Sequence, residues 1–369
     1  MINKFILVAP LSSLSKRLRL FKISRFVYKE LCTNIAHFSW ERVQGESEEV
    51  GLGFKPEKKI LLRGGGYGGK KNKVMYFLWM WKVFLSSFTI KKNDVVWALG
   101  FESAFPLLLL SRIKGFKIFF DDADRFSMLF NQSFFTNIIS LFEKVTSRNV
   151  YKHIIPSKAR YGFNSDRFFL LQNTPSEIEL INSYKIYKEK TWINAQLVVC
   201  INGWLSSDRG MDIALKLSKE LINNDVAFIL VGQLECSDAI QLSQQGNVQY
   251  IGTVSNAEAL AAYYASDFVF TYYNPKKVIN IYAASNKWGD AIKTNIGIIV
   301  NSEVITADFL IRERLTISYQ YEDYMSVASE LRKFCADRQR LKLLKQKMNS
   351  ISNNYPYYEY QLKELFSTI

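Results

Sequence analysis

Short apolar runs alternate with helical patterns along the whole chain. Runs of four to five apolar residues, rich in β-branched and aromatic side chains, predict buried strands, and apolar side chains at helical spacing between them predict helices. Strands are expected at 5–9, 59–62, 95–99, 117–120, 153–155, 197–201, 228–231, 248–251, 268–271 and 296–300. Helices are expected at 74–85, 104–112, 136–145, 209–221, 257–264, 287–294 and 324–335.

Alternation of strands and helices predicts βαβ units and parallel sheets. Two sets of this alternation predict two Rossmann-like, doubly wound α/β domains facing across a cleft. A polar, mixed-charge stretch at 183–194 is the natural boundary. We therefore expect one domain over 1–185, a second over 186–350 and a terminal segment, 351–369, whose apolar stripe must find a surface to cover.

The net charge of the chain indicates which classes of partner it binds. Among 369 residues, 48 Lys and Arg against 34 Asp and Glu give a net charge of +14, which favours nucleic acid, acidic lipid headgroups or phosphorylated substrates. Two His and four widely spaced Cys argue against a zinc site or a disulfide framework and fit a reducing cytoplasm. No apolar stretch reaches the length that spans a bilayer, and the N-terminus is expected to form a strand, not a signal peptide.

The loop at 202–210 follows a predicted strand and opens a predicted helix. Gly203 allows a ligand to approach the backbone, and the free N–H groups of a helix N-terminus attract anions. Arg209 adds a planar donor suited to a phosphate. The alternative is an ordinary capped helix with a solvated Arg209.

A second loop, at 282–292, precedes another predicted strand. Lys287 near a helix N-terminus is unfavourable unless an anion lies there. Asp290, about one turn further on, is placed to accept hydrogen bonds from a sugar diol. The alternative is a surface ion pair at i, i+3 spacing.

The order of these features resembles the donor-binding domain of the group 1 (family 4-like) glycosyltransferases, which have the GT-B fold. The matching segments are the glycine loop with arginine at 203–210, the strand ending in Val-Gly at 228–232, the Val-x-Tyr-x-Gly strand at 248–252, the helix at 258–267 and the Ser-Asn-Lys-x-x-Asp-Ala helix at 285–291. Each motif is weak alone, and five in order over about 100 residues form a specific pattern.

The resemblance implies roles for individual residues of the second domain. Gly203, Arg209 and Lys287 would bind the donor diphosphate, Asp290 the ribose, Gly252 and Thr253 would lie at the nucleotide base, and Tyr282, Ser285 and Asn286 near the donor sugar. Two positions depart from the family. Tyr282 stands where many members carry a first acidic residue, and Trp204 stands where many carry a second phosphate-binding arginine.

The first domain matches the family loosely. The segment 119–126 resembles an Asp-x-x-Asp-x-Phe loop, which marks Asp121 and Asp124 as catalytic candidates on the acceptor side. The same loop contains an Asp-x-Asp metal motif at Asp122 and Asp124, and its acids also fit a helix N-cap. The glycine-rich run 63–69 is interpreted as a mobile acceptor-side loop or a plain surface loop. The basic and apolar segment 15–29 fits either a helix lying on an anionic membrane or a core-facing helix.

The resemblance implies a glycosyltransferase that moves a sugar from a nucleotide-diphosphate sugar to a saccharide acceptor, with retention at the anomeric carbon and no metal or other cofactor. We expect a lipid-linked acceptor in bacterial surface-polysaccharide biosynthesis (O-antigen or capsule) and a cytoplasmic enzyme held peripherally on the inner face of the cell membrane. In this family the terminal helix crosses back to the first domain. The alternatives are a non-catalytic nucleotide-sugar-binding protein and a basic nucleic-acid-binding protein, and no recognisable module supports nucleic acid as a partner.

Overall fold

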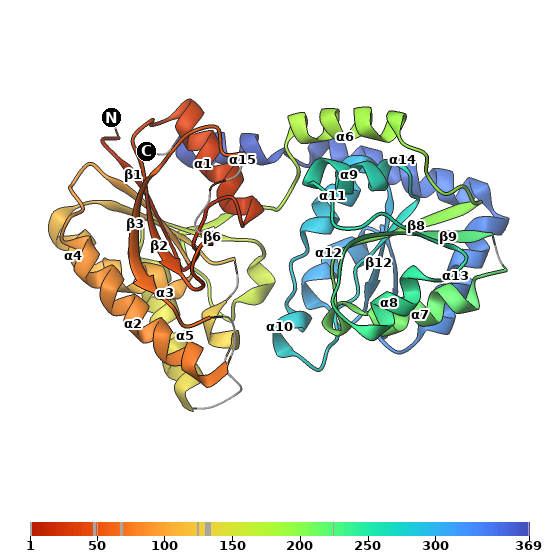
Figure 1. Cartoon of the computed structure of the whole chain (residues 1–369), viewed down its shortest axis with the longest axis horizontal. Helices are drawn as coiled ribbons and strands as arrows, with labels where there is room; N and C mark the ends of the chain where they lie inside the picture. Colours follow the sequence, from red (N-terminus) through yellow and green to blue (C-terminus); the bar gives the residue numbers. More distant parts are fainter. Residues whose placement is uncertain are drawn as a thin grey trace. The chain divides into compact units, whose positions relative to one another are not determined.

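The computed structural model describes residues 2–46, 49, 51–66, 69–123, 125–129, 134–223, 225–367 and 369, and of residues 69–73, 129, 134 and 135 the backbone alone. The chain forms two compact units. Unit 1 comprises Met1–Leu171 with Leu362–Ile369, and unit 2 comprises Gln172–Gln361. Each unit contains one wholly parallel sheet covered by helices on both faces (Figure 1).

Unit 1 is built on a 7-stranded sheet with the order β3-β2-β1-β4-β5-β6-β7. Its strands are β1 (Phe5–Ala9), β2 (Ile35–Glu41), β3 (Glu57–Arg63), β4 (Val95–Leu99), β5 (Lys117–Asp121), β6 (Lys152–Ile155) and β7 (Phe168–Leu170). Its helices are α1 (Leu18–Glu30), α2 (Gly69–Ser87), α3 (Phe101–Ala104), α4 (Leu108–Lys114), α5 (Phe134–Asn149) and the last residues of α15 (Tyr358–Phe366).

The two faces of this sheet carry different helices. On one face α2, α3 and α4 cover Ile6, Val8, Val96 and Ile118. On the other face the alternate residues Phe5, Trp97 and Phe119 contact the ring of Phe366 from α15. This period-2 alternation is what a strand buried on both sides requires.

Unit 2 is built on a 6-stranded sheet with the order β10-β9-β8-β11-β12-β13. Its strands are β8 (Leu197–Leu205), β9 (Val226–Leu234), β10 (Val248–Tyr250), β11 (Phe268–Phe270), β12 (Gly297–Asn301) and β13 (Thr316–Tyr319). Its helices are α6 (Glu177–Glu189), α7 (Met211–Glu220), α8 (Ser237–Ser243), α9 (Asn256–Tyr264), α10 (Val278–Ile281), α11 (Asn286–Thr294), α12 (Asp308–Arg312), α13 (Tyr324–Ala336) and α14 (Arg338–Asn354).

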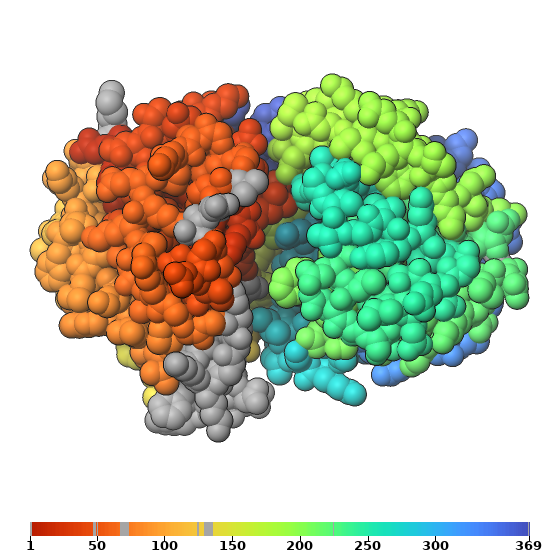
Figure 2. Space-filling model, viewed as in Figure 1, coloured from red at the N-terminus to blue at the C-terminus, as the bar shows by residue number. Residues whose placement is uncertain are grey.

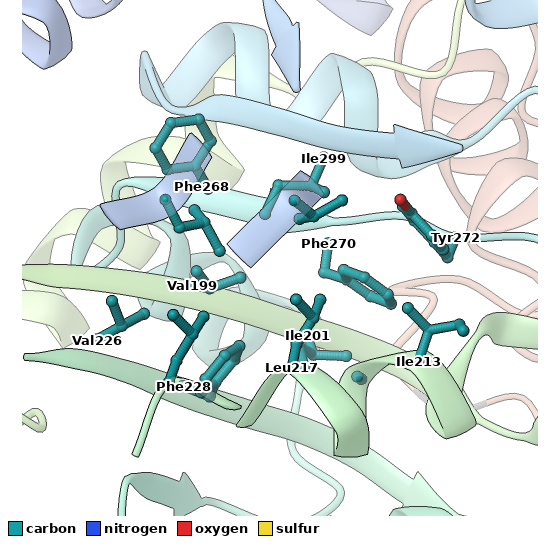
Figure 3. Close-up of a cluster of buried hydrophobic side chains, with 14 of the residues drawn as sticks. Val199, Ile201, Ile213, Leu217, Val226, Phe228, Phe268, Phe270, Tyr272 and Ile299 are labelled. Carbon is teal, nitrogen blue, oxygen red and sulfur yellow. The ribbon is translucent and has the colours of Figure 1, made fainter. Parts of the chain in front are cut away.

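In unit 2, alternate residues of each strand likewise pack on opposite faces of the sheet. Val199 and Ile201 of β8 pack with Phe228, Phe268 and the helix α7 on one face of the sheet (Figure 3). The intervening Val198 and Cys200 pack with the α11 side chains Trp288 and Ile292 on the other face. Both clusters bring together residues distant in the sequence.

The boundary between the units differs from the one expected at residue 185. The division falls between residues 171 and 172, and α6 belongs to unit 2. The reason is packing: Tyr184 and Tyr187 of α6 contact the ring of Tyr264 at the end of α9. The polar stretch at 183–194 that suggested the boundary comprises the second half of α6 and the residues after it, and lies within unit 2.

Candidate nucleotide-sugar site

The order of the strands marks one point on each sheet where a ligand is expected. In unit 2 the strands β9 and β10 lie on one side of β8, and the chain then continues on the other side with β11. Loops diverge at such a switch point, and ligands of doubly wound sheets bind in the crevice outside the carboxyl ends of the strands there. In unit 1 the corresponding point lies between β1 and β4.

Three glycines form a bare backbone surface at the switch point of unit 2. Gly203 and Gly232 are paired between β8 and β9 and have φ of +108° and +126°. A Cβ on Gly232 would lie 1.9 Å from the Gly203 carbonyl oxygen, so only glycine fits. The N–H of Gly232 donates to the carbonyl of Gly252 at 2.8 Å. The predicted Gly203 and Gly252 are therefore joined through Gly232.

Lys287 lies over this glycine surface. Its Nζ is 3.6 Å from the position that a Cβ on Gly203 would take. Ser285 caps the helix α11 by accepting the N–H of Lys287 at 3.3 Å. Trp288 anchors the same turn, because its buried indole Nε1 donates to Thr271 Oγ1 at 3.0 Å. Helix capping and an aromatic anchor thus hold the lysine at the switch point.

Arg209 projects from the short turn Ser207–Arg209 that follows β8. Its guanidinium lies over the ring of Tyr273, 4.7 Å from the centroid. The backbone of Tyr273 is held in turn by Asn301, whose Oδ1 accepts the Tyr273 N–H at 2.9 Å. The neighbouring Asp208 does not neutralise this arginine, because it pairs with Lys277 at 2.5 Å.

The positive charges of Arg209 and Lys287 are the next feature of the site. Within the described part of the chain, no carboxylate lies within ion-pair distance of Arg209 or Lys287, although both side chains are half-buried. Removing a cation from water without a counter-charge is costly. The arrangement at the glycine surface is therefore suited to an anion that supplies the missing charge.

Asp290 lies one turn beyond Lys287 on α11 and is half-buried. Burial raises the pKa of the Cys200 thiol to about 12, with Lys287 lowering it and Asp290 raising it. Burial and the charge of Asp290 also raise the pKa of Tyr263, whose hydroxyl donates to Asn202 Oδ1 at 3.0 Å. Lys287 and Asp290 thus both act on the buried thiol of Cys200. The sequence did not indicate Cys200 or Tyr263, because each is an unremarkable residue within a predicted element.

The remaining donor-side candidates occupy loop positions. Thr253 is exposed directly after Gly252, Asn286 is exposed at the first position of α11, and Tyr282 is half-buried after α10. Their roles toward a ligand stay predictions.

The acceptor-side candidate Asp121 of unit 1 is inaccessible to solvent. Asp121 at the end of β5 is fully buried, and Arg19 Nε donates to both of its oxygens at 2.9 Å. Trp97 Nε1 donates to Oδ2 at 3.1 Å. This engagement favours a structural role over proton transfer with an acceptor. Asp124 lies outside the described residues, as do residues 67 and 68 of the glycine-rich loop.

Glu102 is a residue that the sequence reading did not single out. It follows β4 at the switch point of unit 1, and its side chain folds back so that a Cβ on Gly100 would lie 2.5 Å from its Oε2. Burial raises its pKa to about 8, and Asp122 adds to the shift, against the lowering effect of Arg17 and Arg42. A carboxyl that changes its proton near neutral pH at a sheet edge is a functional candidate. No pattern in the sequence reports burial of this kind.

The chain is similar to known proteins in its structure and not in its sequence. No family model and no curated protein matches the chain. HepE of Anabaena, solved in complex with UDP-glucose, is 12% identical with a TM-score of 0.68 over 99% of this chain and 100% of that chain. WaaG, a glycosyltransferase involved in lipopolysaccharide biosynthesis, is 13% identical with a TM-score of 0.61, covering 98% of each chain. Sucrose-phosphate synthase from Thermosynechococcus elongatus is 13% identical with a TM-score of 0.66, covering 99% of this chain and 98% of that one. With its two parallel-sheet α/β domains, the chain has the GT-B fold of these glycosyltransferases.

Proposed function

We propose that this protein is a glycosyltransferase that transfers a sugar from a nucleotide-diphosphate sugar to a saccharide acceptor. The observation that carries the proposal is Lys287 over the glycine surface at the switch point of unit 2, together with Arg209 in the turn that follows β8. Neither cation pairs with a carboxylate among the described residues. A diphosphate supplies the charge that this place lacks. The complex of HepE with UDP-glucose supports the same class of donor.

The mechanism follows from where charge develops. As the bond between the sugar and the diphosphate breaks, negative charge accumulates on the leaving phosphate oxygens. Arg209, Lys287 and the first N–H groups of α11 would stabilise this charge more strongly than that of the ground state, which lowers the barrier. Asp290 would accept hydrogen bonds from the ribose hydroxyls, and the backbone at Gly252 and Thr253 would border the base.

We extend the proposal to a lipid-linked acceptor, retention at the anomeric carbon and a role in surface-polysaccharide assembly without a metal. The net charge of +14 supports a location at an anionic membrane surface. No helix in the described part of the chain is both long and apolar enough to cross a bilayer. Asp121 is left out of the proposal because of its buried ion pair, and Asp124 stays a prediction.

Arg209→Ala and Lys287→Ala test the donor site. Each variant loses one charge-assisted contact of about 1.5–3 kcal/mol, so affinity for UDP and UDP-glucose falls by about tenfold or more. Calorimetric titration measures this change, and transfer of label from UDP-sugars measures turnover. Lys276→Ala, which removes an exposed cation from the loop before α10, is the matched control and keeps wild-type affinity.

Two results would contradict the proposal. Unchanged affinity in both variants would remove the diphosphate from this place. Tight binding of nucleotide sugars with neither transfer to any acceptor nor hydrolysis would identify a non-catalytic binding protein.

A further inference from the structure

The helix α2 carries apolar side chains on two opposite sides. One side packs into unit 1, where Trp79 and Val83 are fully buried and Trp79 Nε1 donates to Ser103 Oγ at 3.2 Å. The other side exposes Val74 by 68%, Phe77 by 65% and Trp81 by 55%. Leu85 and Phe88 continue this outward stripe, since positions 74, 77, 81, 85 and 88 recur at helical spacing.

Neighbouring helices enlarge the exposed apolar area. Leu109 and Ile113 of α4 are exposed by 59% and 71%, and Leu141, Phe142 and Val145 of α5 are also exposed. Together with the α2 stripe we call these residues the α2–α4–α5 face. Monomeric soluble proteins rarely leave an apolar area of this extent uncovered, and such areas mark sites of interaction.

Hydrogen bonds near their C-terminal ends hold the three helices side by side. Lys114 at the end of α4 donates through Nζ to the carbonyl of Phe88 at 2.6 Å and that of Ile90 at 3.2 Å. Arg112 of α4 donates to Asn149 Oδ1 at the end of α5. Figure 2 shows the orange part of the chain, which includes α2, at the surface of unit 1.

Among the described residues, the exposed charges at the edge of this face are positive. Residues 69–92 include six lysines and no Asp or Glu. The exposed cations at its edge are Lys82, Lys91, Lys92, Arg112 and Arg148. The nearby acids Asp94 and Glu143 are buried, and Glu143 is held by Arg125 at 2.9 Å. The face therefore presents apolar and aromatic side chains bordered by positive charge.

We propose that the α2–α4–α5 face docks on an anionic lipid bilayer. Trp and Phe side chains insert at the level of the lipid headgroups, and Lys and Arg beside them are attracted to acidic lipids. A second copy of the chain is a poorer occupant, because pairing two such faces would bring like charges together. The purpose of docking, access to a lipid-linked acceptor, rests on the proposed function, whereas the binding itself needs no sugar transfer.

The segment 15–29 is a weaker candidate for this contact. The helix α1 turns Leu20, Ile23 and Val27 into unit 1, where all three are fully buried. It therefore has no free apolar side to insert, and its outward cations alone would act over the membrane surface.

Binding to vesicles tests the docking face. The wild-type chain should sediment with vesicles of phosphatidylcholine and phosphatidylglycerol, and more weakly with phosphatidylcholine alone. The double variant Phe77→Asn with Trp81→Asn should bind both kinds at least about tenfold more weakly, because the inserted aromatic area is lost. Lys91→Gln with Lys92→Gln should weaken binding to anionic vesicles by roughly thirtyfold and leave binding to neutral vesicles nearly unchanged.

Controls separate docking from folding and from donor binding. Ile178→Asn with Ile240→Asn removes two side chains of unit 2 that are exposed by 60% and 47%, and should bind vesicles like the wild type. Melting temperatures and affinity for UDP should stay at wild-type values in all variants. The vesicle assay contains no nucleotide sugar, so its outcome does not depend on catalysis.

Each contrary result has a distinct meaning. Equal vesicle binding by the wild type and Phe77→Asn with Trp81→Asn would overturn the docking face. A wild-type dimer in solution that this double variant dissolves, without binding to vesicles, would assign the face to self-association instead. If the wild-type chain transfers sugar but does not bind vesicles, the docking proposal is wrong and the proposed function still holds. If it binds vesicles but has no affinity for nucleotide sugars, the proposed function is wrong and the docking proposal still holds.

Discussion

At the scale of single residues, the pair of Arg19 and Asp121 distinguishes a structural carboxylate from a catalytic one. Asp121→Asn leaves the buried guanidinium of Arg19, 7% exposed, without its counter-charge. We expect unit 1 to lose about 3–5 kcal/mol of stability, measured by urea unfolding, with UDP affinity unchanged. Asp308→Asn is the control, because its ion pair with Arg312 is exposed and should cost less than about 1 kcal/mol. Wild-type stability with lost transfer activity would instead restore Asp121 as a catalytic candidate.

Glu102 makes stability depend on pH in a definite direction. Its pKa is about 8 in the folded protein against an ordinary 4.5, so between these values the folded state holds a proton that the unfolded chain has released. The free energy of unfolding therefore falls as pH rises through this window. In Glu102→Gln the free energy of unfolding should decrease less steeply with pH than in the wild type, by at most about 1.4 kcal/mol per pH unit. Urea unfolding along a pH series measures both slopes. The exposed Glu313→Gln should keep the wild-type slope, and an unchanged slope in Glu102→Gln would contradict the raised pKa.

At the scale of elements, the sequence predicted β1 and β4 to the residue and missed β2, β7 and β13. β1 and β4 match the expected ranges 5–9 and 95–99, because every residue in them is apolar and buried. The strand β2 was missed, since His37, Ser39 and Glu41 interrupt its apolar residues. Those polar side chains are buried against residues from other parts of the chain. The local periodicity of a sequence cannot predict such distant contacts. His37, for example, has its pKa lowered by burial despite the nearby Glu49 carboxylate.

Helix α11 gives a prediction that opposes intrinsic helix propensity. Gly289→Ala would normally stabilise a helix by about 1 kcal/mol. Here the added Cβ would lie 2.2 Å from the carbonyl oxygen of Asn173, a backbone atom that cannot turn away. We expect a net loss of about 1–3 kcal/mol on thermal unfolding and weaker UDP binding through displacement of Lys287. Gly246→Ala, with no atom within 4 Å of its added Cβ, should be neutral or mildly stabilising. A stabilised Gly289→Ala would show that α11 does not rest on this segment.

At the scale of the whole molecule, the last helix packs the end of the chain into the core of unit 1. Residues Leu362–Ile369 belong to unit 1, where Phe366 contacts Phe5, Phe26, Trp97 and Phe119 at ring distances of 5.4–6.0 Å. Phe366→Ala should leave a cavity there and cost about 3–5 kcal/mol, measured as a loss of stability by calorimetry. Glu364→Ala, on the exposed side of the same helix, should leave the melting temperature unchanged. Equal melting temperatures for both variants would mean that the helix does not stabilise unit 1.

The amino-acid sequence was sufficient to predict the α/β class and the doubly wound pattern, because the local order of apolar residues shows which strands are buried. It also predicts donor-side roles for Gly203, Arg209 and Lys287, and these roles stay predictions. Tertiary structure was needed to find that Gly232 joins Gly203 to Gly252, that Arg19 neutralises Asp121 and that α2 keeps a second apolar side outside. Each of these depends on what packs against a residue from a distant part of the chain. Hydropathy alone cannot say which of two apolar sides of a helix a core will cover.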